Sequence, residues 1–270
     1  MSQIGDYLQS VFSLEGKVIL LTGAAGGIGE AFARGLAAAG GSVAMCDLNK
    51  HRCEEIASEL KNEGHDINAY ELDVSDLSSV KKCVSDVLAD SGKIDILVNC
   101  AGVNKREGFL DVQEDTYDRI MGINLKGVFQ LSQEVVRHMI TRKQGNIINI
   151  CSHNDEGMMG GCSVYGAAKS GLRALTRSMA IEWAKHGIRA NALSPGHIIT
   201  PLTTVTWEHP TRSEYLLDRI AMRRPGKPEE LVGMCIMLAS DASSYMSGQA
   251  YHVDGGCLCG GDPWDFDTAY

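Results

Sequence analysis

The sequence lacks the basic excess that would direct it to nucleic acid or to an anionic membrane. Its 270 residues include 25 lysines and arginines against 34 acidic residues, a formal net charge of −9 at pH 7. Nucleic acid and anionic lipid attract basic surfaces, so neither is expected as a partner. No apolar run approaches the roughly 18 residues of a membrane span. The N-terminal residues also lack the basic segment followed by an apolar stretch that is typical of a secretory signal peptide. A soluble, cytoplasmic protein is therefore expected.

Clustered cysteines are also missing. The nine cysteines are odd in number and scattered, with no CxxC pair and no Cys/His group at the spacing of zinc ligands. We interpret them as reduced thiols and expect neither a disulfide framework nor a metal. They occupy positions 46, 53, 83, 100, 151, 162, 235, 257 and 259.

Strand-like and helical segments alternate along the chain. Their apolar runs predict seven strands, at 17–22, 42–47, 67–73, 94–99, 146–151, 189–193 and 249–254. Six long helices are expected between them, at 30–39, 50–64, 76–92, 112–142, 162–186 and 228–239, with an irregular region over 200–224. This order predicts a single doubly wound α/β Rossmann domain over 1–270, a seven-stranded parallel sheet with helices on both faces.

Two segments lie outside that alternation. Residues 1–14 form a polar N-terminal extension with at most one amphipathic turn, through Tyr7, Leu8, Val11 and Phe12. Residues 257–270 form a C-terminal tail. No internal repeat or interdomain linker separates a second domain, and 44% hydrophobic composition supplies one large core.

A glycine-rich turn from Gly23 to Gly29 joins the first strand to the first long helix. Glycines let backbone approach a pyrophosphate, and a helix N-terminus offers it unpaired N–H groups and the positive end of a dipole. Asp47 ends the second strand, where a carboxylate can accept hydrogen bonds from ribose hydroxyls but repels a 2′-phosphate. The pattern predicts NAD rather than NADP. Lys50 and Arg52 follow Asp47 and are interpreted as solvated charges.

Tyr165 and Lys169 are spaced for proton transfer. Four residues apart on a helix, they project from one face, and an ammonium beside a phenol favours the phenolate and lowers its pKa. Ser152 follows a predicted strand, where its hydroxyl could donate to a substrate oxygen. The three could form a proton-handling site, although a YxxxK pair alone is common on exposed helices.

Over about residues 14–256 the chain resembles a short-chain dehydrogenase/reductase. The resemblance is carried by Thr22–Gly29, Asp73-Val74, Asn99–Gly102, Asn124, Ser152, Tyr165 with Lys169, and Pro195–Thr200. It implies an NAD-dependent oxidoreductase that moves hydride between nicotinamide C4 and a secondary alcohol or ketone, with the cofactor supplying the hydride.

The resemblance also implies roles for individual residues. Tyr165 would be the proton donor or acceptor, Lys169 would bind the nicotinamide ribose and lower the tyrosine pKa, and Ser152 would hold the substrate oxygen. Asn124 would support a water-linked proton path. The implied cofactor-binding residues are Gly23, Gly27, Ile28, Gly29, Asp47, Asp73, Val74, Asn99, Ala101, Gly102, Tyr165, Lys169, Pro195, Gly196, Ile198 and Thr200.

Two positions depart from the family pattern. Cys100 stands where the family usually has an asparagine, and a thiol donates hydrogen bonds poorly, which puts one local backbone hydrogen bond in doubt. The polar, acidic run His153–Glu156 replaces small residues after Ser152. His153 is either a pH-sensitive substrate contact or part of a polar loop.

The substrate prediction depends on a basic pair after the fourth strand. Residues 101–107, with 12–17 and 215–219, resemble the gluconate and deoxygluconate dehydrogenase branch, in which basic residues here lie beside the substrate carboxylate. Arg106 could bind it as a bidentate fork and Lys105 as a point charge, or both could be solvated. Asp155 and Glu156 would oppose an anionic substrate if they lined the same pocket. His153 and His197 are the other candidate substrate residues.

A sugar acid or polyol is therefore the predicted small-molecule substrate. The alternatives are a ketone on an acyl carrier or secondary metabolite, and a non-catalytic dinucleotide-binding regulator. Intact Ser152, Tyr165 and Lys169 argue against a regulator, which has no need of a proton relay. The apolar helices 112–142, 162–186 and 228–239 and the family habit favour a homotetramer.

Overall fold

The structure, a computed structural model, describes residues 3–201 and 203–260; the outer part of the predicted C-terminal tail, 261–270, lies outside it. Within the described residues, seven parallel strands form one sheet in the order β3-β2-β1-β4-β5-β6-β7, which confirms the predicted fold class. The strands are β1 Val18–Thr22, β2 Ser42–Asp47, β3 Ile67–Glu71, β4 Ile96–Asn99, β5 Gly145–Ile150, β6 Ile188–Pro195 and β7 Ala250–Val253.

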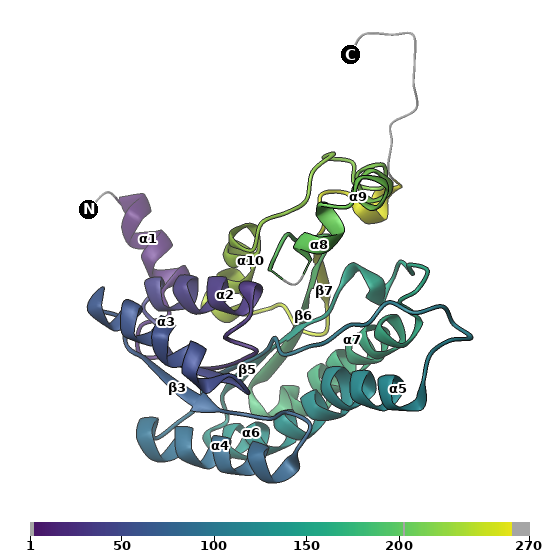
Figure 1. Cartoon of the computed structure of the whole chain (residues 1–270). Coiled ribbons are helices and arrows are strands. Elements are labelled where there is room, and N and C mark those ends of the chain that lie inside the picture. The colour runs from purple at the N-terminus through teal and green to yellow at the C-terminus, as the bar shows by residue number, and fades with distance from the viewer. Residues whose placement is uncertain (1–2, 202, 261–270) are drawn as a thin grey trace.

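Helices cover both faces of this sheet (Figure 1). One face packs against α2 Gly27–Ala38, α3 Lys50–Asn62 and α10 Glu229–Ala239. The other packs against α4 Leu77–Ser91, α6 Val128–Arg142 and α7 Ser163–Trp183. This double cover explains why β1 and β5 are buried at every residue and carry unbroken apolar or small-polar runs.

The order in which strands are added to the sheet changes direction between β1 and β4: β2 and β3 are added on one side of β1, and β4 to β7 on the other. β1 pairs with β2 on one side and with β4 on the other, so the connections after β1 and after β4 leave toward opposite edges. Ligands of open α/β sheets bind at such a switch point, beyond the carboxyl ends of the strands. The fold therefore places the glycine turn and the end of β5 on one common edge.

The predicted long helix over 112–142 is interrupted. It consists of α5 Glu114–Met121, a π-helical turn Gly122–Gly127, and α6. Inside the turn, Asn124 Nδ2 donates to the carbonyl of Ile120 at 2.9 Å and to that of Val103 at 2.8 Å. Single π-helical turns within α-helices are frequent at functional sites.

Two further segments are more regular than predicted. The N-terminal extension forms the helix α1 Gln3–Phe12 rather than a single turn. The region 200–224 contains α8 Thr204–Trp207 and α9 Pro210–Leu217, which lie beyond the end of β6 (Figure 1). Proline at the first position of α9 and the His209 side chain, which accepts from Arg212 N–H, start that helix locally. Among the described residues, no helix combines the length and apolarity needed to cross a bilayer.

Candidate active site

A cleft of about 610 Å³ opens at the carboxyl edge of the sheet. Its volume is that of a cofactor or small-ligand site. Most residues predicted for the site line it: Gly23, Gly27, Ile28, Gly29, Asp47, Asp73, Val74, Ala101, Gly102, Arg106, Ser152, His153, Tyr165, Lys169, Pro195, Gly196, His197, Ile198 and Thr200. Asn99, Lys105 and Asn124 are not among the described residues that line it.

The glycine turn closes one end of the cleft and leaves its backbone open to a ligand. Gly23 has a φ of +67°, and a Cβ there would lie 2.7 Å from Ala101 Cα. A Cβ on Gly29 would lie 2.0 Å from the carbonyl oxygen of Gly23. Only glycine fits at both positions. The N-cap of α2, Gly26, has no side-chain cap, so the first turn of α2 keeps amide groups for an anion. These residues fit the pyrophosphate of a dinucleotide.

Asp47 fixes this turn to the end of β2. Its Oδ2 accepts from the amide of Ala25 at 3.1 Å, and its Oδ1 accepts from the amide of Asn49 at 2.9 Å. Both bonds keep the carboxylate at the cleft wall, where Leu48 adjoins it. Asp73 and Val74 continue this wall, with Asp73 Oδ1 accepting from the amide of Ser75 at 2.8 Å.

The basic residues after Asp47 are paired with acids. Lys50 Nζ lies 3.4 Å from Glu54, and Arg52 contacts Glu55 at 3.0 Å and Glu30 at 3.1 Å. Neither lines the cleft among the described residues. Their charges are therefore already engaged on α2 and α3 rather than free for a phosphate.

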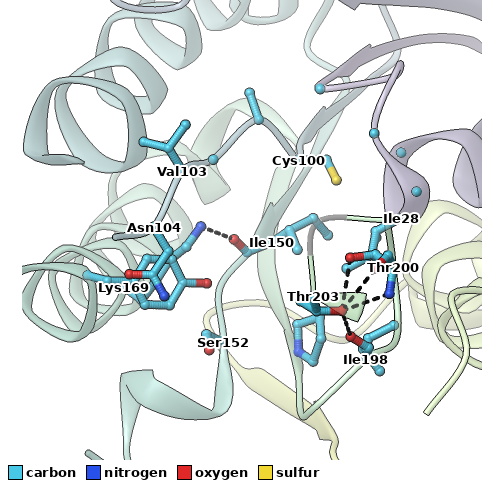
Figure 2. A pocket seen from close by; sticks show the side chains of 18 of the residues that line it. Ile28, Cys100, Val103, Asn104, Ile150, Ser152, Lys169, Ile198, Thr200 and Thr203 are labelled. Carbon is cyan, nitrogen blue, oxygen red and sulfur yellow. Dashed lines mark hydrogen bonds between the residues drawn. The ribbon is translucent and has the colours of Figure 1, made fainter. Parts of the chain in front are cut away.

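Ser152, Tyr165 and Lys169 meet at the other wall of the cleft. Figure 2 shows Ser152 and Lys169 opposite Ile28, Ile198 and Thr200. Lys169 Nζ donates to the carbonyl of Ile150 at 2.7 Å and lies 5.7 Å from the centre of the Tyr165 ring. Ser152 Oγ accepts from the amide of Asn154 at 3.2 Å, which leaves its hydroxyl hydrogen for another acceptor.

Burial shifts the pKa values of Tyr165 and Lys169. Desolvation raises the pKa of Tyr165 to about 12, and the hydrogen bond with Ser152 opposes that rise. Desolvation also lowers the pKa of Lys169. The sequence predicted that the ammonium would lower the tyrosine pKa; in the structure the loss of solvent raises it. The phenol is therefore protonated at neutral pH and can donate its proton to a bound oxygen.

Two predicted polar residues lie behind the cleft. Asn124 Oδ1 accepts from the amide of Val103 at 3.2 Å and would lie 2.7 Å from a Cβ on Gly102. Asn99 Nδ2 donates to Asn149 Oδ1 at 2.8 Å and to Ser132 Oγ at 3.2 Å. Asn124 thus holds the backbone after β4, while Asn99 ties the end of β4 to β5 and α6.

Thr22 holds the turn in which Cys100 stands. Thr22 Oγ1 accepts from the amides of Cys100 and Ala101, each at 3.0 Å. The threonine thereby holds the turn after β4 against β1. The thiol itself lines the cleft as an apolar group.

The part of the cleft where the sequence predicts the substrate carries Arg106 and two histidines. The rings of His153 and His197 lie with centroids 4.5 Å apart, and Trp207 meets His197 edge-on at 6.3 Å. Burial lowers the pKa of His197 to about 3, helped by His153 and Arg106, and burial lowers the pKa of His153. Both imidazoles are neutral at pH 7, and Arg106 is a cationic neighbour that acts on His197.

The other charged candidates point elsewhere. Lys105 Nζ pairs with Glu107 at 2.6 Å, outside the cleft. Asp155 accepts from Ser194 Oγ and lies 3.0 Å from His252 Nε2. Glu156 pairs with Arg173 at 2.7 Å. The acidic residues after Ser152 therefore do not face a substrate in this cleft.

Sequence reasoning missed several lining residues. Asn104 comes shortly after Gly102, and Met159 comes shortly after the run His153–Glu156. Trp207 lies in the region 200–224, which was expected to be irregular. Asn104 Nδ2 lies 3.7 Å from Cys162 Sγ and faces the same space as Lys169 (Figure 2). For Asn104 and Met159 the only signal in the sequence was their closeness to predicted site residues. Trp207 is carried to the cleft by the short helix α8, and no sequence pattern predicted that helix.

Comparisons with known proteins agree with this geometry. A family model described as enoyl-(acyl carrier protein) reductase matches residues 23–257. The chain is 36% identical over 251 residues to 5-keto-D-gluconate 5-reductase of Escherichia coli, covering 93% of this chain and 99% of the relative. It is 39% identical over 247 residues to a 3-oxoacyl-(acyl-carrier-protein) reductase of Thermotoga maritima, covering 91% and 99%. A gluconate 5-dehydrogenase from Burkholderia cenocepacia, solved in complex with NADP and tartrate, has a TM-score of 0.90 at 38% identity, covering 93% and 98%.

Proposed function

Because the chain belongs to the short-chain dehydrogenase/reductase family of NAD(P)-dependent oxidoreductases, we propose that it interconverts a secondary alcohol of a sugar acid and the corresponding ketone. One observation carries the proposal: Ser152, Tyr165 and Lys169 share a cleft with the guanidinium of Arg106, while its other end is the glycine turn. The end with Arg106 suits a hydroxy acid, and the end with the glycine turn suits a dinucleotide.

The chain's own residues supply positioning and the proton. A bound nicotinamide dinucleotide would supply or accept the hydride. During ketone reduction, Ser152 Oγ would donate to the carbonyl oxygen and Tyr165 would transfer its phenolic proton to that oxygen; alcohol oxidation reverses the transfer. Lys169, held by the carbonyl of Ile150, would place a positive charge beside the developing phenolate. Asn124 would keep the π-turn that supports a proton path behind Lys169.

The remaining lining residues would hold the cofactor. The first turn of α2 would bind the pyrophosphate, Asp47 the adenosine ribose, and Asp73 with Val74 the adenine. Ala101, Gly102 and the segment Pro195–Thr200 would line the nicotinamide end. Asn99, which lies behind the cleft, would act on the cofactor only through the turn that it holds.

We propose NAD as the preferred cofactor, although the Burkholderia relative was solved with NADP. The proposal rests on Asp47, whose carboxylate stands at the cleft wall with its two amide bonds. The pairing of Lys50 and Arg52 with acids supports it, since neither cation is free to hold a 2′-phosphate.

The preference for a sugar acid rests on Arg106. A guanidinium recognises a carboxylate through two parallel hydrogen bonds, and the neutral His153 and His197 can exchange hydrogen bonds with hydroxyls. A relative reduces 5-keto-D-gluconate, and the Burkholderia structure holds tartrate, a hydroxy acid. The likeness to the Thermotoga reductase favours one second candidate, a 3-oxoacyl group on an acyl carrier.

A panel of substrates with a single variant tests the function. Purified protein is assayed with NAD(H) and NADP(H) against hexonic acids, their keto forms, neutral polyols and a short 3-oxoacyl thioester. We expect turnover of a sugar acid, and Tyr165→Phe should lower kcat by about a hundredfold or more with little change in cofactor affinity. Activity on the thioester alone would select the second candidate, and a Tyr165→Phe variant with wild-type kcat would overturn the mechanism.

We also propose that the protein is a cytoplasmic homotetramer. Exposed Tyr117 and Phe129 lie on α5 and α6, and Phe129 shares a shallow groove with Met121, Leu125 and Leu175. Apolar side chains gathered on an outer helical face suit a contact between copies. Light scattering coupled to gel filtration measures the mass, and a monomer would refute the assembly.

A further inference from the structure

Three metal-ligating side chains meet beside the substrate end of the cleft. His153 follows β5, His197 follows β6, and Cys257 follows β7 in a short 3-10 turn, Cys257–Cys259. One ligand atom from each residue lies within 4.8 Å of the other two. Three neighbouring strands therefore deliver two imidazoles and a thiol to one point at the edge of the sheet.

Their ligand atoms are not consumed by other bonds. His153 Nδ1 lies 3.4 Å from the carbonyl oxygen of Pro195, which can only accept, so Nδ1 carries the hydrogen and Nε2 keeps a lone pair. The His197 ring contacts His153 and Trp207 but makes no hydrogen bond within the described residues. Cys257 is a free, partly buried thiol. A carbonyl that orients the far nitrogen of an imidazole is the usual arrangement behind a metal-bound histidine.

Asp254 fixes the cysteine and adds a negative charge nearby. Its Oδ1 accepts from the amide of Gly256 at 2.9 Å and its Oδ2 from the amide of Leu258 at 2.9 Å. The carboxylate interacts electrostatically with all three ligands and would attract a cation between them. Burial, and then this carboxylate, raise the pKa of the Cys257 thiol, so the metal must displace a firmly held proton. The charges of Arg106 near His197 and of Arg219 near Cys257 act in the opposite sense.

We propose that His153, His197 and Cys257 form a site for a zinc-class divalent ion that closes the substrate end of the cleft. Imidazole with thiolate is a donor set for zinc, whose ligand atoms stand about 3.3 to 3.8 Å apart in tetrahedral geometry. The side chains would draw together by about 1 Å around the ion. On binding, the thiol loses its proton to solvent and its sulfur coordinates the metal.

The consequence is reversible inhibition. Hydride transfer with Ser152, Tyr165 and Lys169 needs no metal, while an ion held by His153 and His197 occupies space offered to the substrate. A fourth coordination position would remain open toward the cleft. Zinc should therefore compete with the substrate and leave dinucleotide binding unchanged.

A second group of potential ligands lies nearby but is engaged elsewhere. Asp155, Glu156 and His252 also gather closely enough to hold an ion. Asp155 already bonds Ser194 and His252, and Glu156 pairs with Arg173. Metal there would have to break these bonds, so the histidine and cysteine site is favoured.

Cobalt titration tests the site without relying on activity. Protein treated with a chelator and desalted is titrated with Co²⁺, whose bond to a thiolate gives a near-ultraviolet charge-transfer absorption. We expect a saturable band at one cobalt per chain. Cys257→Ser should abolish the band, and His197→Ala should weaken binding by about tenfold or more. The matched control is Cys259→Ser, which removes an exposed thiol two residues away and should keep the band.

The same variants separate the site from other thiols of the cleft. Cys46, Cys100, Cys151 and Cys162 line it, and metal bound there would give a band that survives in Cys257→Ser. That result, or a wild-type protein with no saturable band, would overturn the proposal. In the activity arm, zinc should raise KM reversibly in wild type and in Cys259→Ser, and Cys257→Ser should lose this response relative to its own metal-free rate. A KM that zinc leaves unchanged in wild type would refute the inhibition.

Discussion

Asp47 gives the sharpest test of cofactor choice, because its carboxylate both holds the glycine turn and would repel a 2′-phosphate, and these two effects are measured separately, as folding stability and as a ratio of cofactor affinities. Both carboxylate oxygens accept an amide, from Ala25 and from Asn49. In Asp47→Asn only one oxygen remains, and the new NH₂ group faces the other amide. The variant therefore removes the negative charge and one hydrogen bond, while side-chain volume is conserved.

The two parts have different magnitudes. Loss of a hydrogen bond to a charged group costs about 1.5 to 3 kcal/mol of folding stability. Two unit charges about 4 Å apart repel by about 4 kcal/mol at an effective dielectric constant of 20, and a 2′-phosphate carries more than one charge. Salt and the open cleft weaken that repulsion, so we take about 2 kcal/mol, or about thirtyfold in the ratio of NADPH to NADH affinity.

Calorimetric titration with NADH and NADPH measures that ratio in wild type and in Asp47→Asn. Wild type should bind NADH more tightly, and the variant should lose most of the discrimination, chiefly through tighter NADPH binding. Asp66→Asn, which removes an exposed acid outside the cleft, controls for net charge. If wild type prefers NADPH, or if the ratio is unchanged in Asp47→Asn, the electrostatic reasoning is wrong.

Three further predictions follow from the site and the core. Arg106→Ala should raise KM for an acidic substrate by about tenfold or more and leave a neutral polyol unaffected, whereas Lys105→Ala, paired with Glu107 outside the cleft, should match wild type; equal effects of the two variants would refute the assignment. Because the pKa of Tyr165 is raised to about 12, alcohol oxidation should accelerate as pH rises from about 6 to 10, while ketone reduction stays level; a flat oxidation profile would contradict this. Asp95→Asn should destabilise the fold by about 3 kcal/mol at pH 7 in urea denaturation, since Arg142 and Lys93 lose their buried partner. Burial alone would raise the pKa of Asp95, but the Val18 amide and the two cations hold it below its usual value, so this stabilisation should persist above about pH 4 and fade below it.

The fold was predictable because its signals are local. Unbroken apolar runs such as Val18–Leu21 mark strands buried on both faces, and glycines such as Gly29 mark a turn that no other residue fits. The order of these signals is enough to define a doubly wound sheet. The tyrosine and lysine could be placed on one helix face for the same reason, since their spacing is set within a single helix.

Contacts between distant segments explain what could not be predicted. The π-turn at Asn124 depends on the Val103 carbonyl, which belongs to another loop. The position of Trp207 depends on α8, a single turn without an amphipathic pattern. The tyrosine pKa depends on how much solvent the assembled cleft excludes, which no spacing between Tyr165 and Lys169 can show.

The run after Ser152 shows why the composition of a short segment does not determine the charge of a site. His153, Asn154 and Asp155 form one 3-10 turn, in which successive side chains point about 120° apart. His153 consequently faces the cleft, while Asp155 points to His252 on β7 and the following Glu156 reaches Arg173 on α7. Among the described lining residues, the acids Asp47 and Asp73 stand at the cofactor end. Arg106 lines the cleft beside the two imidazoles, whereas Asp254, whose carboxylate also acts on both rings, is not among the described lining residues. The cleft therefore presents a guanidinium to an anionic substrate despite the acidic sequence around it.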